Sequence, residues 1–110
     1  MEKGYTIADW SERYRFSEAN VKACAPAAWG VYRLIYRSGD SYHVFYVGQS
    51  EDLNARLLQH LQVSESNTCI RKFLHEHTCF FRFLKVGTQA DRMRIEQEQL
   101  KKYNPTCNAT

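Results

Sequence analysis

An arginine and a histidine one helical turn apart, Arg56 and His60, are the first residues whose types and spacing suit chemistry. They lie in the stretch from Gly48 to Leu61, which predicts a helix. Five residues fall on one face of that helix: Leu53, Arg56, Leu57, His60 and Leu61. A helix that only packs would fill such a face with apolar side chains. A cationic and a titratable group there indicate that an anion binds.

The last predicted helix runs from about Gln89 to Tyr103 and also carries a polar group on its inward face, here a carboxylate. The spacing predicts an inward stripe of four residues: Ala90, Met93, Leu100 and Tyr103. Glu96 falls on this stripe, whereas Glu98 is turned by about 200° and faces water. Burying a carboxylate is unfavourable unless a cation or a raised pKa compensates. We therefore expect Glu96 to bind a cation, just as Arg56 and His60 bind an anion.

A β-hairpin is predicted to position the first helix. The two strands run from Gly30 to Arg37 and from Tyr42 to Val47, and a short SGDS turn makes them antiparallel. Gly48 suits a sharp bend into the helix, for which Ser50 is the expected N-cap. The remaining elements are a helix from about Asn67 to Glu76, a strand from Phe80 to Val86 and the last helix, which Pro105 closes. This order predicts an α/β fold of the α+β kind, a small mixed sheet covered by helices.

Residues 1–28 are predicted to be a lead-in with helical pieces rather than a strand, and residues 29–110 the main domain. Ser17 is a candidate N-cap, with Phe16 before it and Val21 after it as a hydrophobic staple. Pro26 is expected to end that helix.

Composition excludes several classes of protein. At 110 residues, with 44% hydrophobic and 25% charged residues, the chain is long enough for one ordinary folded domain. No apolar run approaches the roughly 20 residues of a membrane helix, and the N-terminus, MEKGYTIADW, lacks the apolar stretch of a signal peptide. We therefore expect a cytoplasmic protein without a membrane partner. The net charge of +3 permits a polyanionic partner.

The four cysteines give no framework for disulfides or zinc. They are Cys24, Cys69, Cys79 and Cys107. They form no C-x-x-C pair, and in a cytoplasmic protein we expect reduced, partly buried thiols. His75, His77 and Cys79 alternate as in a strand, which is weak evidence for zinc without a second ligand pair.

The residues that suit chemistry stand in the order of a known motif set. Gly30-Val31-Tyr32 and Tyr46-Val47-Gly48 lie on the hairpin, and they are followed by Arg56, Glu96, Pro105 and Asn108. Over about residues 29–108 the chain resembles the GIY-YIG nuclease family. The run YVGQSEDLNARL is especially similar to this domain in the nuclease subunit of bacterial nucleotide excision repair. His60 is more similar to the homing and restriction branches of the family.

The resemblance implies a small three-stranded antiparallel sheet flanked by helices. It also implies hydrolysis of nucleic-acid phosphodiesters with one divalent metal ion. The implied site residues are Tyr32, Tyr46, Arg56, His60 and Glu96, supported by Gly30, Gly48 and Asn108. Tyr32 matches the family's proposed general base, Arg56 the residue that binds the scissile phosphate, and Glu96 the ligand of Mg²⁺ or Mn²⁺. Tyr46 lines the site and His60 supports it.

The residue types agree with this chemistry. Arginine binds phosphoryl oxygens through a fork of donors, and Mg²⁺ held by one carboxylate keeps its other positions for water and phosphate. A tyrosine with a pKa near 10 needs help to act as a base. We expect Arg56 and the metal site to lower the pKa of Tyr32.

Each of these residues alone has an ordinary structural interpretation, for example Tyr32 as a sheet aromatic or Arg56 as a solvated helix residue. Their coincidence at every motif position favours an endonuclease acting on DNA more than on RNA, with a role in DNA repair or recombination. Four basic residues are candidate backbone contacts: Arg33, Arg71, Lys72 and Lys101. No separate DNA-binding module follows, which allows for a protein partner that supplies specificity. The alternative is a catalytically silent nucleic-acid-binding or adaptor domain with the same fold.

Overall fold

The predicted hairpin forms two neighbouring strands of the sheet. In the computed structural model, which describes residues 10–108, β2 (Gly30–Ser38) and β3 (Ser41–Ser50) pair in antiparallel register, with Gly30 opposite Ser50 and Tyr32 opposite Gly48. Gly39 has a φ of 61° in the turn between them, a left-handed conformation that glycine adopts without strain. Both strands are longer than predicted, so β3 leads directly into the turn before the next helix.

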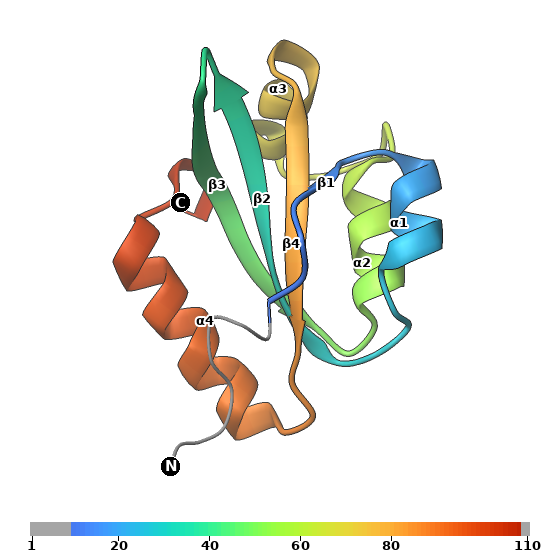
Figure 1. Ribbon diagram of the computed structural model, residues 1–110, viewed down its shortest axis with the longest axis vertical. Coiled ribbons are helices and arrows are strands. Elements are labelled where there is room, and N and C mark those ends of the chain that lie inside the picture. Colours follow the sequence, from blue (N-terminus) through green and yellow to red (C-terminus); the bar gives the residue numbers. More distant parts are fainter. Residues whose placement is uncertain (1–9, 109–110) are drawn as a thin grey trace.

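The sheet has four strands in the order β1-β4-β2-β3, all antiparallel neighbours. The other elements are β1 (Tyr14–Arg15), α1 (Glu18–Cys24), α2 (Leu53–His60), α3 (Thr68–Glu76), β4 (Cys79–Lys85), α4 (Gln89–Tyr103) and the 3-10 helix η2 (Thr106–Asn108). Figure 1 shows α4 on one side of the sheet and α1 with α2 on the other. The α+β class is confirmed.

The prediction of three strands and a purely helical lead-in was wrong. β1 pairs with β4 through Tyr14 opposite Phe81 and Arg15 opposite Phe80. Two residues are too few to show a period-2 pattern, so only the pairing in space defines this strand. Residues 1–9 of the lead-in, and residues 109–110, lie outside the described part of the chain.

Side-chain caps set where the helices begin. Ser17 caps α1 as predicted, accepting from the Asn20 backbone N–H at 3.2 Å, with Val21 fully buried. Asn67 caps α3 in the same way. The cap of α2 is Asp52 rather than the predicted Ser50, and it accepts from the Ala55 N–H at 3.0 Å.

Strand alternation divides the interior into two cores. Tyr32, Leu34 and Phe45 face α1 and α2. Val31 and Val47 face α4, where they pack with its residue Ile95. Along β2, Val31 therefore faces one core, and Tyr32 and Leu34 face the other.

The inward face of α4 differs from the predicted stripe. The buried residues are Arg92 and Ile95, while Met93 is 52% exposed and Ala90 is also exposed. The Arg92 guanidinium lies 3.8 Å from the Trp29 ring centroid and donates to the Val86 carbonyl at 3.3 Å. A long stem with a stacked, hydrogen-bonded head makes an arginine part of the core, and a pattern of apolar residues alone misses it.

The expectation of reduced thiols was wrong for one pair of cysteines. Cys69 and Cys107 form a disulfide with a Cα–Cα distance of 5.4 Å, which joins the start of α3 to η2. They are 38 residues apart in sequence, so only the packing of η2 against α3 brings them within bonding range. Cys24 and Cys79 are free. Within residues 10–108 no helix is long and apolar enough to span a membrane.

Candidate active site

The two motif glycines make room for the centre of the site. A Cβ on Gly48 would lie within 3 Å of the Tyr32 ring and hydroxyl, its partner across the hairpin. A Cβ on Gly30 would collide with the Leu84 carbonyl and with Leu53, the first residue of α2. Gly48 thus lets the Tyr32 hydroxyl lie against the strand, and Gly30 lets α2 approach it.

Tyr32 and His60 meet in the interior between β2 and α2. The Tyr32 hydroxyl is 2.7 Å from His60 Nε2, and the two side chains are 0% and 2% exposed. Tyr46 from β3 completes an aromatic cluster, with its ring centroid 6.1 Å from Tyr32 and 5.4 Å from His60. Three of the predicted site residues are therefore in mutual contact.

His60 is held from its other side by a residue that the sequence did not single out. Its Nδ1 lies 2.5 Å from a carboxylate oxygen of Glu65, in the loop between α2 and α3. Burial lowers the pKa of His60, and Glu65 opposes this shift. Burial acts to raise the pKa of Glu65, but the Asn67 amide and His60 outweigh it and keep that pKa below its ordinary value. At neutral pH the pair is thus a neutral imidazole beside a carboxylate.

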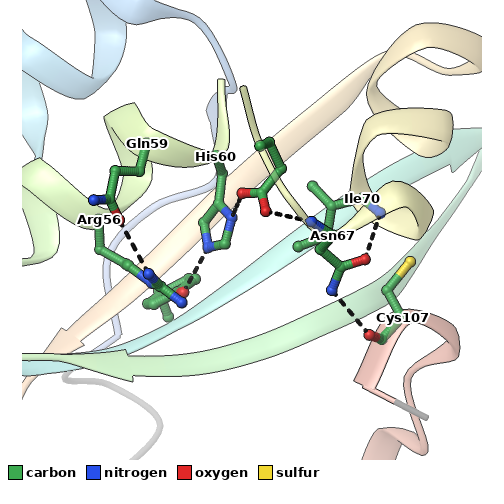
Figure 2. Close-up of polar contacts among 8 residues, drawn as sticks. Arg56, Gln59, His60, Asn67, Ile70 and Cys107 are labelled. Carbon is green, nitrogen blue, oxygen red and sulfur yellow. Dashed lines mark hydrogen bonds and ion pairs between the residues drawn. The ribbon is translucent and has the colours of Figure 1, made fainter. Parts of the chain in front are cut away.

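Arg56 lies at the exposed rim of the same group. Leu53, Leu57 and His60 turn inward from α2, while Arg56 is exposed and donates to Gln59 at 3.0 Å (Figure 2). Arg56 and His60 therefore lie on one side of α2, where His60 is buried and Arg56 is exposed.

Arg56 acts to lower the pKa of Tyr32, as predicted, but the net shift is in the opposite direction. Burial raises the pKa of its phenol far above the ordinary value of 10, and Tyr46 adds to the effect. A hydrogen bond and the charge of Arg56 act in the opposite direction without outweighing burial. Tyr32 is accordingly a neutral phenol in hydrogen-bond contact with His60, not a standing phenolate.

Glu96 approaches the sheet from the α4 side. It is half-buried, and its Oε1 accepts from Gln49 Nε2 at 2.9 Å. Gln49 pairs with Val31, on the opposite side of the hairpin from Tyr32. Since β3 is an edge strand, a group that touches both Glu96 and the Tyr32 cluster has to reach around this edge.

The donor set around Glu96 fits a hydrated divalent ion. The described residues contain no cluster of three or more histidine, cysteine or acidic side chains that could hold a metal. A single carboxylate with one oxygen engaged by an amide leaves the remaining positions of a metal ion to water and substrate oxygens, which suits Mg²⁺.

A protein-family model, the UvrC-like GIY-YIG domain, matches residues 28–109. The chain belongs to the UvrC-like GIY-YIG family. Curated relatives include the UvrABC system protein C of Rickettsia canadensis, 26% identical over 84 residues, and that of Rickettsia rickettsii, 27% identical over 84 residues. Each alignment covers 76% of this chain and 12% of the relative. The chain therefore spans only about an eighth of the length of these proteins.

Solved structures of the GIY-YIG N-terminal endonuclease domain of UvrC from Thermotoga maritima share the fold. The magnesium-bound form is 22% identical with a TM-score of 0.64, over 83% of this chain and 93% of that one. A point mutant bound to its catalytic divalent cation gives 21% and 0.63, over 83% and 97%. The GIY-YIG endonuclease type expected from the sequence is confirmed as a family and a fold.

The basic residues of this GIY-YIG domain differ in their access to a partner. Arg33 is 3% exposed, donates to Gln99 at 2.6 Å and lies 3.8 Å from the Trp10 ring centroid. It is a packing residue, and the expectation of a backbone contact there was wrong. Lys101 is exposed on α4. Arg71 and Lys72 are exposed on α3, where they line a groove of about 630 Å³ that reaches His60.

Asn108 closes the edge of β3. Its side chain accepts from the Val47 N–H and donates to the Val47 carbonyl, both at 2.8 Å. It therefore continues the strand ladder in place of a fifth strand and fixes η2 beside the hairpin.

Asn108→Ala is expected to lower the free energy of unfolding by about 1–3 kcal/mol, because Val47 is fully buried and its backbone groups would lose both partners. Urea denaturation followed by circular dichroism measures this. Asn104→Ala is not a suitable control because Asn104 has a φ of 45°, so the exposed Gln97→Ala on α4 serves instead. An Asn108→Ala midpoint equal to that of Gln97→Ala would contradict the role of Asn108.

Proposed function

We propose that this domain, with residues 29–110 as its nuclease unit, is a metal-dependent endonuclease that hydrolyses phosphodiester bonds of DNA. The observation that carries the proposal is the Tyr32 hydroxyl placed 2.7 Å from His60 Nε2, with the exposed Arg56 guanidinium beside it. It provides a proton acceptor and a phosphate ligand at one place, as hydrolysis of a phosphodiester requires.

Arg56 binds the scissile phosphate in this proposal. Its guanidinium offers a fork of donors to two phosphoryl oxygens and neutralises the charge that develops on them. In the free protein Arg56 lies beside the Tyr32 hydroxyl. Moving from the tyrosine onto a phosphate would uncover the hydroxyl for the attacking water.

Tyr32 is the general base, and His60 receives its proton. A buried phenol does not ionise by itself at neutral pH. It can take a proton from water if it passes its own proton to the neutral imidazole at the same moment. Tyr46 packs on both rings and holds them in position.

Glu96 would hold the divalent ion, with Gln49 orienting its carboxylate. When bound, Mg²⁺ or Mn²⁺ supplies electrophilic assistance to the phosphoryl and leaving oxygens. DNA is the proposed substrate because Arg71 and Lys72 expose basic side chains along the groove that reaches His60, and Arg56 is exposed on α2. A partner protein or further chain would supply specificity, since the matched relatives carry this domain as a small part of their length.

The test is cleavage of supercoiled plasmid with Mg²⁺ or Mn²⁺, and with EDTA as the metal-free control. Glu96→Gln is expected to lower the rate about 10²-fold or more, because loss of metal binding removes several kcal/mol of stabilisation. The matched control is Glu98→Gln, which changes the same charge on the exposed side of α4 and should cut like the wild type. DNA binding without cleavage in wild type and variants alike would instead identify an adaptor domain.

A further inference from the structure

Glu65 is bound at both carboxylate oxygens. Oε1 contacts His60 Nδ1 at 2.5 Å, and Oε2 accepts from the Asn67 backbone N–H at 2.7 Å. The side chain is only 9% exposed. A surface glutamate would keep rotational freedom, whereas this one has a single position fixed from two sides.

The fixation extends into the rest of the fold. Asn67 caps α3 through the Ile70 N–H at 3.1 Å and donates from its amide to the Cys107 carbonyl at 3.3 Å (Figure 2). Cys107 is in turn bonded to Cys69 at the start of α3. The loop that carries Glu65 is thus anchored at the point where α3 meets η2.

The position of Glu65 determines which nitrogen of His60 carries the proton. An ionised carboxylate only accepts hydrogen bonds, so Nδ1 must be the protonated nitrogen of the neutral ring. Nε2 is then an acceptor, and the bond to Tyr32 runs from the phenol to the imidazole. The opposite tautomer would place an N–H toward the Tyr32 hydroxyl, where no proton could be received.

We infer that Glu65 is a positioning residue of the nuclease reaction, which holds His60 in the tautomer that accepts the proton of Tyr32. The inference rests on the proposed function of Tyr32 as the base. The three side chains, from β2, α2 and the following loop, form a relay in the order Tyr32, His60, Glu65.

Every bond and proton in the proposed step is accounted for. A water oxygen forms a bond to phosphorus while the ester bond to the leaving oxygen breaks. The proton of the water passes to the Tyr32 oxygen, and the proton of that phenol passes to His60 Nε2. His60 becomes an imidazolium paired with the Glu65 carboxylate, and it returns the proton to solvent or to the leaving oxygen after the reaction.

Among the residues that the structure describes, four groups act on His60 from the surrounding elements. Tyr32 from β2 and Tyr46 from β3 contact the ring, and Arg56 from α2 repels a proton on it. Only Glu65 attracts such a proton. Removal of its charge should therefore make His60 a weaker base, and the acidic limb of the pH–rate profile should move to lower pH.

Glu65→Gln tests this in the full chain. We expect kcat to fall about 10- to 100-fold with KM unchanged, and the acidic limb of kcat to shift downward in pH. The matched control is Glu12→Gln, an exposed glutamate just before β1 at the far edge of the sheet. Glu65→Asp keeps the charge and should retain the wild-type limb. If Glu65→Gln had the same kcat and the same acidic limb of the pH–rate profile as Glu12→Gln, the inference would be overturned.

A double-mutant cycle separates positioning from general damage. In a His60→Gln background, Glu65→Gln should have less than about a twofold effect, because the residue through which it acts is gone. An equal loss in both backgrounds would overturn the inference. Circular dichroism melts accompany each variant, and Glu65→Asp provides the second test if Glu65→Gln fails to fold.

A readout without activity distinguishes this inference from the proposed function. Nitrogen NMR of the histidine side chains, assigned with His60→Gln, should report a protonated Nδ1 in the wild type and a lower pKa of His60 in Glu65→Gln. A wild type that cuts no DNA while showing these signals would refute the nuclease and leave the tautomer intact. If the wild type cuts DNA but His60 carries its proton on Nε2, the role of Glu65 would be refuted and the nuclease function would stand.

Discussion

Replacing Arg56 by alanine is expected to lower kcat/KM about 10²- to 10³-fold, the effect of losing one preorganised donor to a developing oxyanion. The fold should be unaffected, because Arg56 is exposed and its hydrogen bond to Gln59 is a surface contact within α2. Plasmid cleavage under single-turnover conditions, beside a thermal melt, measures both quantities.

Two further variants make the Arg56 result specific. Arg56→Lys keeps the charge but not the fork of donors, and should recover only part of the rate. Gln59→Ala removes the neighbour of Arg56 in α2 without touching the phosphate ligand, and should cut like the wild type. If Arg56→Ala lost no more rate than Gln59→Ala, the phosphate would have to be bound elsewhere.

The helices and strands with strong local signals could be predicted from the sequence. α4 has the predicted bounds, and Ser17 caps α1 as expected, because caps and hydrophobic periodicity are properties of a short stretch of chain. The features that were missed depend on distant parts of the chain. β1 is defined only by its pairing with β4, and the Cys69–Cys107 disulfide by the docking of η2 on α3.

The residues of the site also divide into those with a local sequence signal and those that depend on distant parts of the chain. Arg56 and His60 were recognisable as a pair because one helical turn separates them, and the motif order located Tyr32 and Tyr46. Glu65 was not recognisable, since a glutamate in a polar loop has no signal until its partner is known. Its only local sign is the position two residues before Asn67, the cap of α3, where its carboxylate meets the Asn67 N–H.

Side-chain burial is the property that was predicted least well from the sequence. Arg33 was predicted to contact the nucleic-acid backbone and Arg92 was assigned no role, yet both are 3% exposed and lie against tryptophan rings. Tyr32 was expected to have a lowered pKa, whereas its full burial raises the pKa. Desolvation depends on every element packed around a side chain, and hence on the complete fold.

Tyr32→Phe is the change with the largest expected effect on catalysis, because it removes the group that takes the proton from water. We expect kcat to fall about 10²- to 10⁴-fold, the usual contribution of a general base. The loss of stability should be smaller, about 1–3 kcal/mol, since His60 Nε2 would remain buried without its donor. Tyr36→Phe, on the same strand and the same face, is the matched control and should keep the wild-type rate.

The pH dependence tests how Tyr32 acts. The pKa of His60 lies below its ordinary value of 6.5, so the wild-type rate should fall only in the acid range, as a proton on Nε2 removes the acceptor for the phenol. No rise from phenolate formation should appear up to about pH 10, because burial keeps Tyr32 protonated there. The residual activity of Tyr32→Phe should lack the acidic limb, since His60 then receives no proton from the site. A Tyr32→Phe profile parallel to that of the wild type would show that the base is another group.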